Sequence, residues 1–240
     1  MGRSYRPHFA KTLAVLAFLG AATIYGFFLH KNQIFPYSML DEVLAVNKMD
    51  PWQSPHFRLR YNLISAFPVS ASVVMVGDSI TELADWRALL PGLDVVNQGI
   101  SGDTTVGLLK RIELVKRTGA RTIALMFGVN DLQQGQTVEQ VNARYLQAID
   151  ELSGPGICLI VQSTLLTRRG AQLNRSIAAL NEKLIDDCKT GKCTFVDLNA
   201  KIAPDGELPT EATVDGIHPT AIVYKIWRDV LFKYFAACPH

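Results

Sequence analysis

Residues 73–81 read Val73-Val74-Met75-Val76-Gly77-Asp78-Ser79-Ile80-Thr81, an apolar run that ends in a glycine and a short polar turn. A continuous apolar run rich in β-branched residues is typical of a strand that is buried on both faces. A helix-length segment follows, so Ser79 is expected on a strand-to-helix turn that presents its hydroxyl at the edge of the sheet. Taken alone, Ser79 is better explained as a helix N-cap.

Similar apolar runs recur along the chain, and helix-length segments separate them. The strand-like runs are residues 73–76, 95–96, 122–127, 157–161 and 195–196. Apolar residues at helical spacing occur in residues 54–67, 104–117, 138–152, 173–188 and 221–235. Strands that alternate with helices predict an α/β fold, in which helices cover both faces of a parallel sheet. We therefore expect a three-layer α/β/α sandwich with a five-stranded parallel sheet.

Polar segments follow the second and third strand-like runs. In such sheets ligands bind where the carboxyl ends of the strands meet, so these segments are candidate site loops. The second run leads to Gly102, where a glycine lets the backbone approach a ligand and aim an N–H group at it. The third leads to Gly128-Val129-Asn130-Asp131, where the side-chain amide of Asn130 is a suitable donor to an oxyanion. Each segment could also be an ordinary turn.

The last candidate segment is Asp215-Gly216-Ile217-His218-Pro219-Thr220, directly before the final predicted helix. The carboxylate of Asp215 can accept from one imidazole nitrogen of His218, which leaves the other nitrogen to take a proton from a serine. Alternatively, His218 could lead into the helix with Pro219 at the first helical position. A metal site is poorly supported, because no other histidine has ligand spacing with Asp215.

Four segments, Gly77-Asp78-Ser79, Gly102, Gly128-Val129-Asn130 and Asp215-Gly216-Ile217-His218, resemble in order the four consensus blocks of the SGNH (GDSL) hydrolase family. The similarity runs from about residue 73 to residue 224. Residues 76–86 and 97–105 are similar to the branch of lysophospholipase-like and platelet-activating-factor acetylhydrolase-like esterases. The resemblance implies the flavodoxin-like arrangement of the SGNH fold.

The resemblance also implies a role for each motif residue. Ser79 is expected to be the nucleophile, His218 its general base and Asp215 the group that orients His218. The backbone N–H groups of Ser79 and Gly102 and the side-chain amide of Asn130 are expected to form the oxyanion hole. Neither a metal nor an organic cofactor is expected. Asp78, Asp103 and Asp131 are interpreted as loop or cap residues.

The expected activity is hydrolysis of a carboxylic ester, with an acyl or acetyl ester of envelope carbohydrate or of a lipid as substrate. An acyltransferase that uses a sugar hydroxyl in place of water is one alternative. A membrane-anchored, non-catalytic binding or scaffold protein that retains the fold is another. The net charge of +2, without a long basic tract, argues against a nucleic-acid partner.

The N-terminal region contains an uncharged apolar stretch at residues 12–29. As a helix it would span about 27 Å, close to the thickness of a bilayer core. Three basic residues precede it, Arg3, Arg6 and Lys11, which predicts a cytoplasmic N-terminus and an exported remainder. A cleaved signal peptide is the alternative, although its apolar core is usually only about 7–15 residues long. We therefore expect an anchor region at 1–31, a tether at 32–53 and the hydrolase domain at 54–240.

The four cysteines are at positions 158, 188, 193 and 238. Cys188 and Cys193 flank a short Lys-Thr-Gly-Lys turn, which predicts a disulfide between them. Cys158 lies within an apolar run and is expected to be a plain core residue.

Overall fold

The computed structural model describes residues 22–23, 25–26 and 51–238 of the chain. Contacts divide the chain into two units, and the unit Met49–His240 contains the sheet. Most of the predicted anchor and tether lies outside the described residues. Within the described ranges, no helix combines the length and the apolarity needed to cross a bilayer. The anchor and the predicted division of the chain therefore stay predictions.

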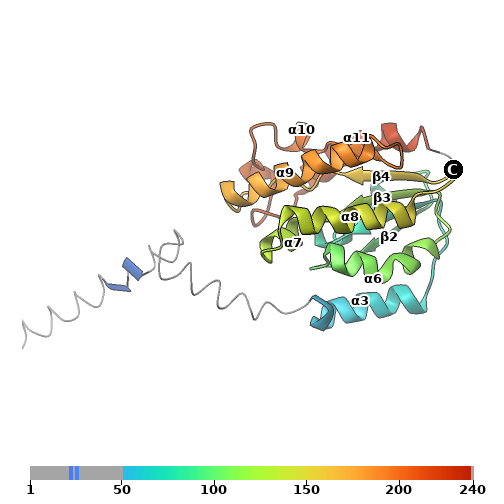
Figure 1. Ribbon diagram of the computed structural model, residues 1–240, viewed down its shortest axis with the longest axis horizontal. Coiled ribbons are helices and arrows are strands. Elements are labelled where there is room, and N and C mark those ends of the chain that lie inside the picture. The colour runs from blue at the N-terminus through green and yellow to red at the C-terminus, as the bar shows by residue number, and fades with distance from the viewer. Residues whose placement is uncertain (1–21, 24, 27–50, 239–240) are drawn as a thin grey trace, which may run out of the picture. The chain divides into compact units, whose positions relative to one another are not determined.

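A five-stranded parallel sheet forms the centre of the second unit (Figure 1). Its strands are β1 (Val73–Gly77), β2 (Val95–Gly99), β3 (Thr122–Met126), β4 (Cys158–Gln162) and β5 (Thr194–Val196). They lie side by side in the order β2-β1-β3-β4-β5, and every neighbouring pair is parallel. All five predicted strands are confirmed. The largest difference in length is in β2, which was predicted over residues 95–96 and pairs with β1 as far as Gly99. Its last residues are polar or glycine, so they do not form part of an apolar run.

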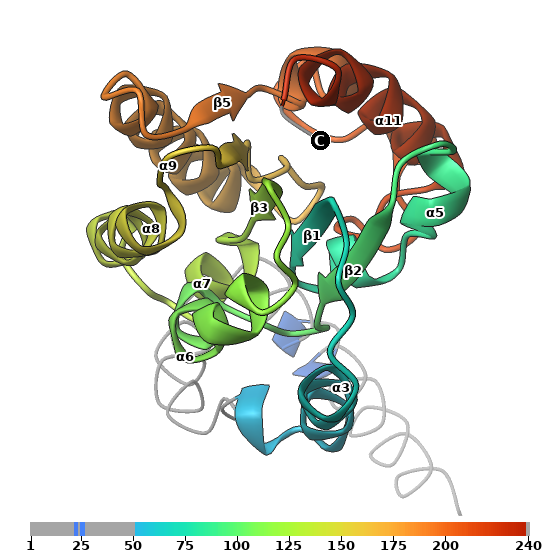
Figure 2. The same cartoon turned by 90° about the vertical axis from the view of Figure 1, so that its right-hand side faces the viewer.

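Helices cover both faces of the sheet, which confirms the predicted three-layer architecture (Figure 2). One face packs against α6 (Thr105–Lys116), α8 (Val138–Leu152) and α9 (Ala171–Cys188), and the other against α5 (Trp86–Leu89) and α11 (Ala221–Phe235). Both faces need a helical layer because alternate side chains of each strand point to opposite faces of the sheet, as in β1. Val73 and Met75 belong to one core cluster and Val74 and Val76 to the other.

The remaining helices are short, apart from α3 (Pro55–Ala66). They are α4 (Ser79–Glu82), α7 (Val129–Gln133), α10 (Asn199–Ile202) and the 3-10 turns η1 (Pro51–Gln53) and η2 (Thr210–Ala212). A helix was expected at Ser79, where α4 begins, although α4 is only one turn long. The other short helices were not predicted, since one turn is too brief to show a helical period. The turn η1 comprises the last residues of the predicted tether, and its Trp52 ring lies 4.7 Å from the ring of Phe57 in α3. The turn η1 therefore packs against α3.

The register of the central strands places the candidate loops together. Gly77 at the end of β1 is opposite both Gly99 of β2 and Met126 of β3. The three strands therefore end level, and the segments that contain Ser79, Gly102 and Asn130 leave the sheet side by side.

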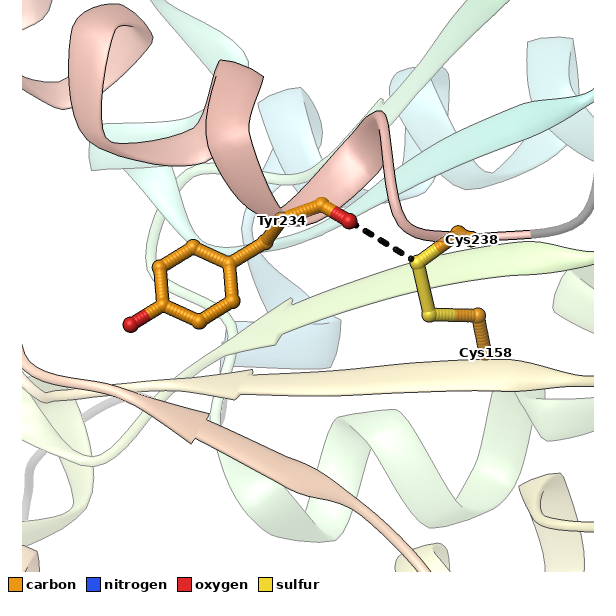
Figure 3. Close-up of a disulfide and its surroundings, with 3 residues drawn as sticks. All are labelled: Cys158, Tyr234 and Cys238. Atoms are coloured by element: carbon orange, nitrogen blue, oxygen red, sulfur yellow. Dashed lines mark hydrogen bonds between the residues drawn. A yellow bond between two sulfur atoms is a disulfide. The ribbon is translucent and has the colours of Figure 1, made fainter.

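The cysteine prediction was right for one pair and wrong for Cys158. Cys188 and Cys193 form the predicted disulfide, with their Cα atoms 4.8 Å apart. Cys158 is not a plain core residue, because it is bonded to Cys238, with a Cα–Cα distance of 5.6 Å (Figure 3). This bond joins the start of β4 to the segment after α11. The apolar sequence around Cys158 gives no sign of a partner 80 residues away.

Removing the long-range disulfide should destabilise the protein. We expect the double variant Cys158→Ala/Cys238→Ala to lose about 2–4 kcal/mol of unfolding free energy, because a long cross-link restricts the unfolded chain. The matched control is Cys188→Ala/Cys193→Ala, which opens a much shorter loop and should lose less. Urea denaturation without reductant measures both. An equal or smaller loss for the Cys158 pair would contradict the expectation.

Candidate active site

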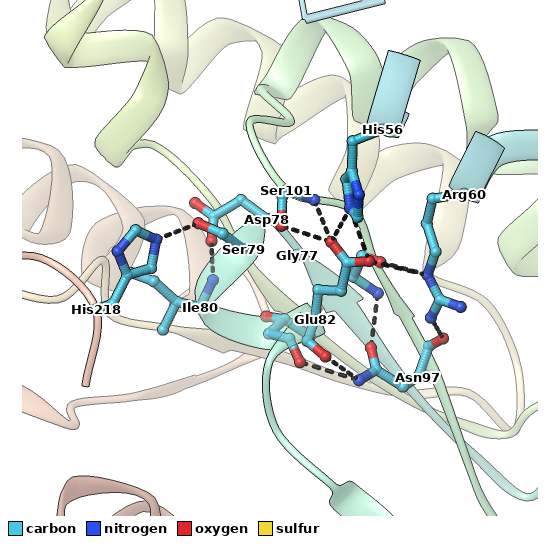
Figure 4. A network of polar contacts seen from close by, with 12 residues as sticks. His56, Arg60, Gly77, Asp78, Ser79, Ile80, Glu82, Asn97, Ser101 and His218 are labelled. Atoms are coloured by element: carbon cyan, nitrogen blue, oxygen red, sulfur yellow. Dashed lines mark hydrogen bonds and ion pairs between the residues drawn. The ribbon is translucent and has the colours of Figure 1, made fainter. Parts of the chain in front are cut away.

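Ser79 is the first residue of α4, immediately after β1. The N-cap of this helix is Asp78, whose Oδ1 accepts from the backbone N–H of Ile80 at 2.9 Å. Ser79 is therefore not needed as a cap, and its hydroxyl is available for another partner. That partner is the imidazole of His218 (Figure 4).

Ser79, His218 and Asp215 form one chain of hydrogen bonds. The Oγ atom of Ser79 lies 2.9 Å from Nε2 of His218, and Nδ1 of His218 lies 2.7 Å from Oδ2 of Asp215. The other carboxylate oxygen accepts the backbone N–H groups of Ile217 and His218 at 2.9 and 2.8 Å. The alternative role for His218 does not hold, since α11 begins at Ala221 rather than at Pro219.

The electrostatics of this chain favour a negative Asp215. Partial burial raises the pKa of Asp215, but the hydrogen bonds from the backbone and ring of His218 and from Ile217 outweigh it, so its pKa lies well below the usual range. The carboxylate is thus ionised at neutral pH and accepts from Nδ1, which leaves Nε2 of His218 as an acceptor for the Ser79 hydroxyl.

The loop that contains Asp215 and His218 is held by its own hydrogen bonds. The Thr213 hydroxyl donates to the carbonyl of His218 at 2.9 Å and accepts from Gly216 N–H at 3.0 Å. The backbone N–H of Arg168, which follows β4, donates to the carbonyl of Gly216 at 2.7 Å. The Tyr224 hydroxyl donates to the carbonyl of Ile80 at 2.7 Å and so joins α11 to α4. Both sides of the Ser79–His218 contact are therefore fixed.

Gly102 lies in the loop between β2 and α6, and Asn130 lies in α7, which follows β3; both were predicted as oxyanion donors. Gly102 has a φ of 80°, a left-handed conformation that favours glycine. Its backbone N–H and that of Ser79 have no acceptor among the described residues. The side-chain amide of Asn130 donates to the carbonyl of Asp103 at 2.9 Å and to Oδ2 of Asp78 at 3.3 Å. The structure thus joins Ser79, His218 and Asp215 in one hydrogen-bonded chain and links Asn130 to Asp103, the residue after Gly102.

Three carboxylates near the site are buried. Asp78 is the N-cap of α4 and Asp103 lies in the loop before α6, as interpreted, whereas Asp131 lies within α7. Asp103 pairs with the buried Arg111 at 2.7 Å, and Asp131 accepts the backbone N–H and hydroxyl of Thr105 at 3.0 and 2.6 Å. Burial raises the pKa of Asp78 to about 7, and it raises that of Asp103 to about 6 although Arg111 favours the ionised form. No group of three or more His, Cys, Asp or Glu side chains within the described ranges could hold a metal ion.

Two charged residues that support the site were not predicted from the sequence. Arg111 donates to Asp103 and, at 3.1 Å, to the carbonyl of Gly77 at the end of β1. Its sequence signal was a charge on the apolar face of the predicted helix, in line with Leu108 and Val115. Glu82 contacts Ser101 and His56, which are far from it in the chain, and no local pattern indicated these contacts.

Solved structures with the same fold come from several bacteria. A candidate platelet activating factor from Streptococcus pneumonia superposes with a TM-score of 0.67 at 22% identity, covering 80% of this chain and 98% of that one. A GDSL-like lipase from Bacteroides thetaiotaomicron gives 0.66 at 20% identity, covering 75% and 97%. A mutant acetylxylan esterase from Geobacillus stearothermophilus gives 0.58 at 18% identity, covering 70% and 94%. At these identities the likeness establishes the fold.

One curated relative is an N-acylneuraminate cytidylyltransferase from Streptococcus agalactiae, 26% identical over 155 residues. The match covers 64% of this chain but only 36% of that protein, so the chain spans about a third of its relative's length.

The profile of the GDSL-like lipase/acylhydrolase family matches residues 75–226. This range includes all four motif segments and more than half of the chain, while α3 lies outside it. The protein therefore belongs to the GDSL-like lipase/acylhydrolase family, a family of ester hydrolases.

Proposed function

We propose that the protein hydrolyses carboxylic esters through a covalent acyl-enzyme formed on Ser79. The observation that carries the proposal is the continuous hydrogen-bonded chain from the Ser79 hydroxyl through His218 to Asp215. A hydroxyl is a weak nucleophile until a neighbouring base takes its proton, and an imidazole oriented by a carboxylate is suited to that task.

In the proposed reaction, Oγ of Ser79 attacks the carbonyl carbon of the ester while its proton passes to Nε2 of His218. Asp215 stabilises the imidazolium that forms. The tetrahedral intermediate then breaks its bond to the alcohol oxygen, which leaves with the proton from His218. Water attacks the acyl-enzyme in the same way, with His218 as base, and releases the carboxylic acid and free Ser79.

The oxyanion of that intermediate is proposed to bind the backbone N–H groups of Ser79 and Gly102 and the amide of Asn130. One amide hydrogen of Asn130 is held by the carbonyl of Asp103, which orients the group. The other makes only a long contact of 3.3 Å with Asp78 and can shift to the oxyanion. A proton on Asp78, which its raised pKa favours, reduces repulsion of the developing negative charge. Loss of one donor of this kind typically costs about 2.7–4 kcal/mol.

The proposed substrate is an acyl or acetyl ester of envelope carbohydrate or of a lipid. The side chains of His218 and Asp215 are 30% and 40% exposed, so an ester carried by a polymer or by a membrane can reach them. A series of p-nitrophenyl esters separates the two classes. Fastest turnover of the acetate would favour carbohydrate acetyl esters, whereas a rate that rises towards the octanoate would favour lipids.

We further propose that the catalytic unit is exported and held at a membrane by residues 12–29. The two disulfides support export, because such bonds persist mainly in oxidising compartments. A reporter fused after residue 240 that is active only outside the cytoplasm should be active in cells, and deletion of residues 1–31 should abolish its signal. A second reporter, which is active only inside the cytoplasm, can be fused at the same position. Activity of that reporter would contradict this location.

Substitution of the nucleophile is the first test of the activity. We expect Ser79→Ala to abolish ester hydrolysis and labelling by a fluorophosphonate probe, because both reactions need the same hydroxyl. The matched control is Ser176→Ala, a half-buried serine in α9, which should retain both. A well-folded wild-type protein that neither turns over esters nor reacts with the probe would favour the scaffold alternative.

The raised pKa of Asp78 predicts how stability depends on pH. Between its ordinary value of 3.8 and the value of about 7 in the folded protein, the folded state keeps a proton that the unfolded state releases. The unfolding free energy should therefore fall as pH rises from about 4 to about 7, by up to about 1.4 kcal/mol per pH unit for one proton.

The control for this prediction is Asp78→Asn, which removes the titrating group while other carboxyls titrate in both proteins. Urea denaturation at intervals from pH 4 to pH 7.5 should give the wild type a steeper fall than the variant. Parallel curves for the two proteins would show that the pKa of Asp78 is not raised.

A further inference from the structure

The short helix α4 connects the nucleophile to the loop that follows β2 (Figure 4). Its first residue is Ser79 and its last is Glu82. Oε2 of Glu82 accepts both the backbone N–H and the hydroxyl of Ser101, each at 2.6 Å. Ser101 directly precedes Gly102, whose N–H is one of the proposed oxyanion donors. The Glu82 carboxylate therefore fixes the loop at the residue next to that donor.

Two residues of helix α3 also hold the Glu82 carboxylate. Nε2 of His56 lies 3.0 and 2.9 Å from the two carboxylate oxygens, and because both are acceptors it is the donor. Nε of Arg60 lies 3.4 Å from Oε1 of Glu82. The same guanidinium donates to the carbonyls of Asn97 and Gly99 at 2.8 and 3.3 Å. Arg60 thus contacts both the carboxylate and the end of β2.

Strand β2 also contacts the backbone of α4 and of the residues after it. The side-chain nitrogen of Asn97 lies 3.1, 3.0 and 3.0 Å from the carbonyl oxygens of Thr81, Glu82 and Ala84. The side-chain oxygen of Asn97 accepts from Gly99 N–H at 2.8 Å. A Cβ atom at Gly99 would collide with the backbone nitrogen of Glu82. The spacing between the nucleophile helix and the loop is therefore closely defined.

The charge of Glu82 strengthens these contacts. Burial raises the pKa of Glu82, but the hydrogen bonds from Ser101 and His56 outweigh it, and the net pKa is lowered. The side chain is only 13% exposed. An ionised and largely buried carboxylate makes stronger hydrogen bonds than a neutral group would.

We propose that Glu82 is a positioning residue, which sets the place of the Gly102 N–H relative to Ser79, and that His56 and Arg60 of α3 hold its carboxylate for this purpose. The inference rests on the proposed function, since it concerns the oxyanion-binding loop of that reaction. It gives α3, which lies outside the residues matched by the family profile, a part in forming the site.

Glu82→Gln tests the proposal, because the neutral amide cannot accept from Ser101, His56 and Arg60 together. We expect kcat for p-nitrophenyl acetate to fall about ten- to hundredfold with KM within about twofold, since a displacement of about 1 Å at a reacting centre can cost about a hundredfold. Rates are expressed per active site, titrated with a fluorophosphonate. A purely structural role would reduce the number of active sites and leave kcat per site unchanged.

Two further variants make the result specific. Ser101→Ala removes only the hydroxyl partner and should lower kcat less, and the double variant should be no slower than Glu82→Gln alone, because both changes break one interaction. Glu113→Gln, an exposed glutamate of α6 paired with Lys116, should leave kcat unchanged. Urea denaturation of each variant identifies any that is not folded at the assay temperature.

The outcomes separate this inference from the proposed function. A wild-type protein without turnover and without probe labelling contradicts the proposed function itself. An active wild type with an unchanged kcat per site in Glu82→Gln contradicts only the positioning role. Additive losses in the double variant contradict it as well, because independent effects mean that Glu82 does not act through Ser101.

Discussion

The level ends of β1, β2 and β3 are the constraint on which the site depends. Because Gly77, Gly99 and Met126 share one register, the segments that follow them leave the sheet together. A shift of one residue in either pairing would turn alternate side chains to the other face and carry a loop away from Ser79. The buried Arg111 ties this arrangement to the core, since it bonds both the carbonyl of Gly77 and the carboxylate of Asp103.

The loops around Ser79 are held mainly by buried polar contacts. Arg111 and Asp103 are both fully buried, and a pair of this kind contributes little net stability because desolvation offsets its attraction. Its effect is geometric, since it fixes the loop that carries Gly102 and accepts the amide of Asn130. Glu82 and Ser101 hold the same loop from the other side. These buried charges therefore add little to stability, and their main effect is to fix the relative positions of groups that the proposed reaction requires.

The fold and the motif residues could be predicted from sequence because their signals are local. Apolar runs located the five strands, and the polar segments after three of them indicated Ser79, Gly102 and Asn130. Asp215 and His218 were indicated by their spacing before the final helix, and the resemblance to the SGNH family supplied the role of each residue. The remainder depends on contacts between distant residues. Cys158 and Cys238 lie 80 residues apart, and His56 and Glu82 lie 26 apart, with no periodicity to relate them. Arg111 was detectable in principle as a charge on an apolar helix face, although its partners were not.

The proposed reaction requires Ser79, His218, Gly102 and Asn130 to surround one reacting carbonyl group. A crystal structure of the protein after reaction with a small phosphonate would reveal this arrangement, because the phosphonyl oxygen takes the place of the oxyanion. We expect phosphorus bonded to Oγ of Ser79, with that oxygen about 2.7–3.1 Å from the backbone nitrogens of Ser79 and Gly102 and from Nδ2 of Asn130. Phosphorus on another residue, or an oxygen that faces solvent away from these donors, would contradict it.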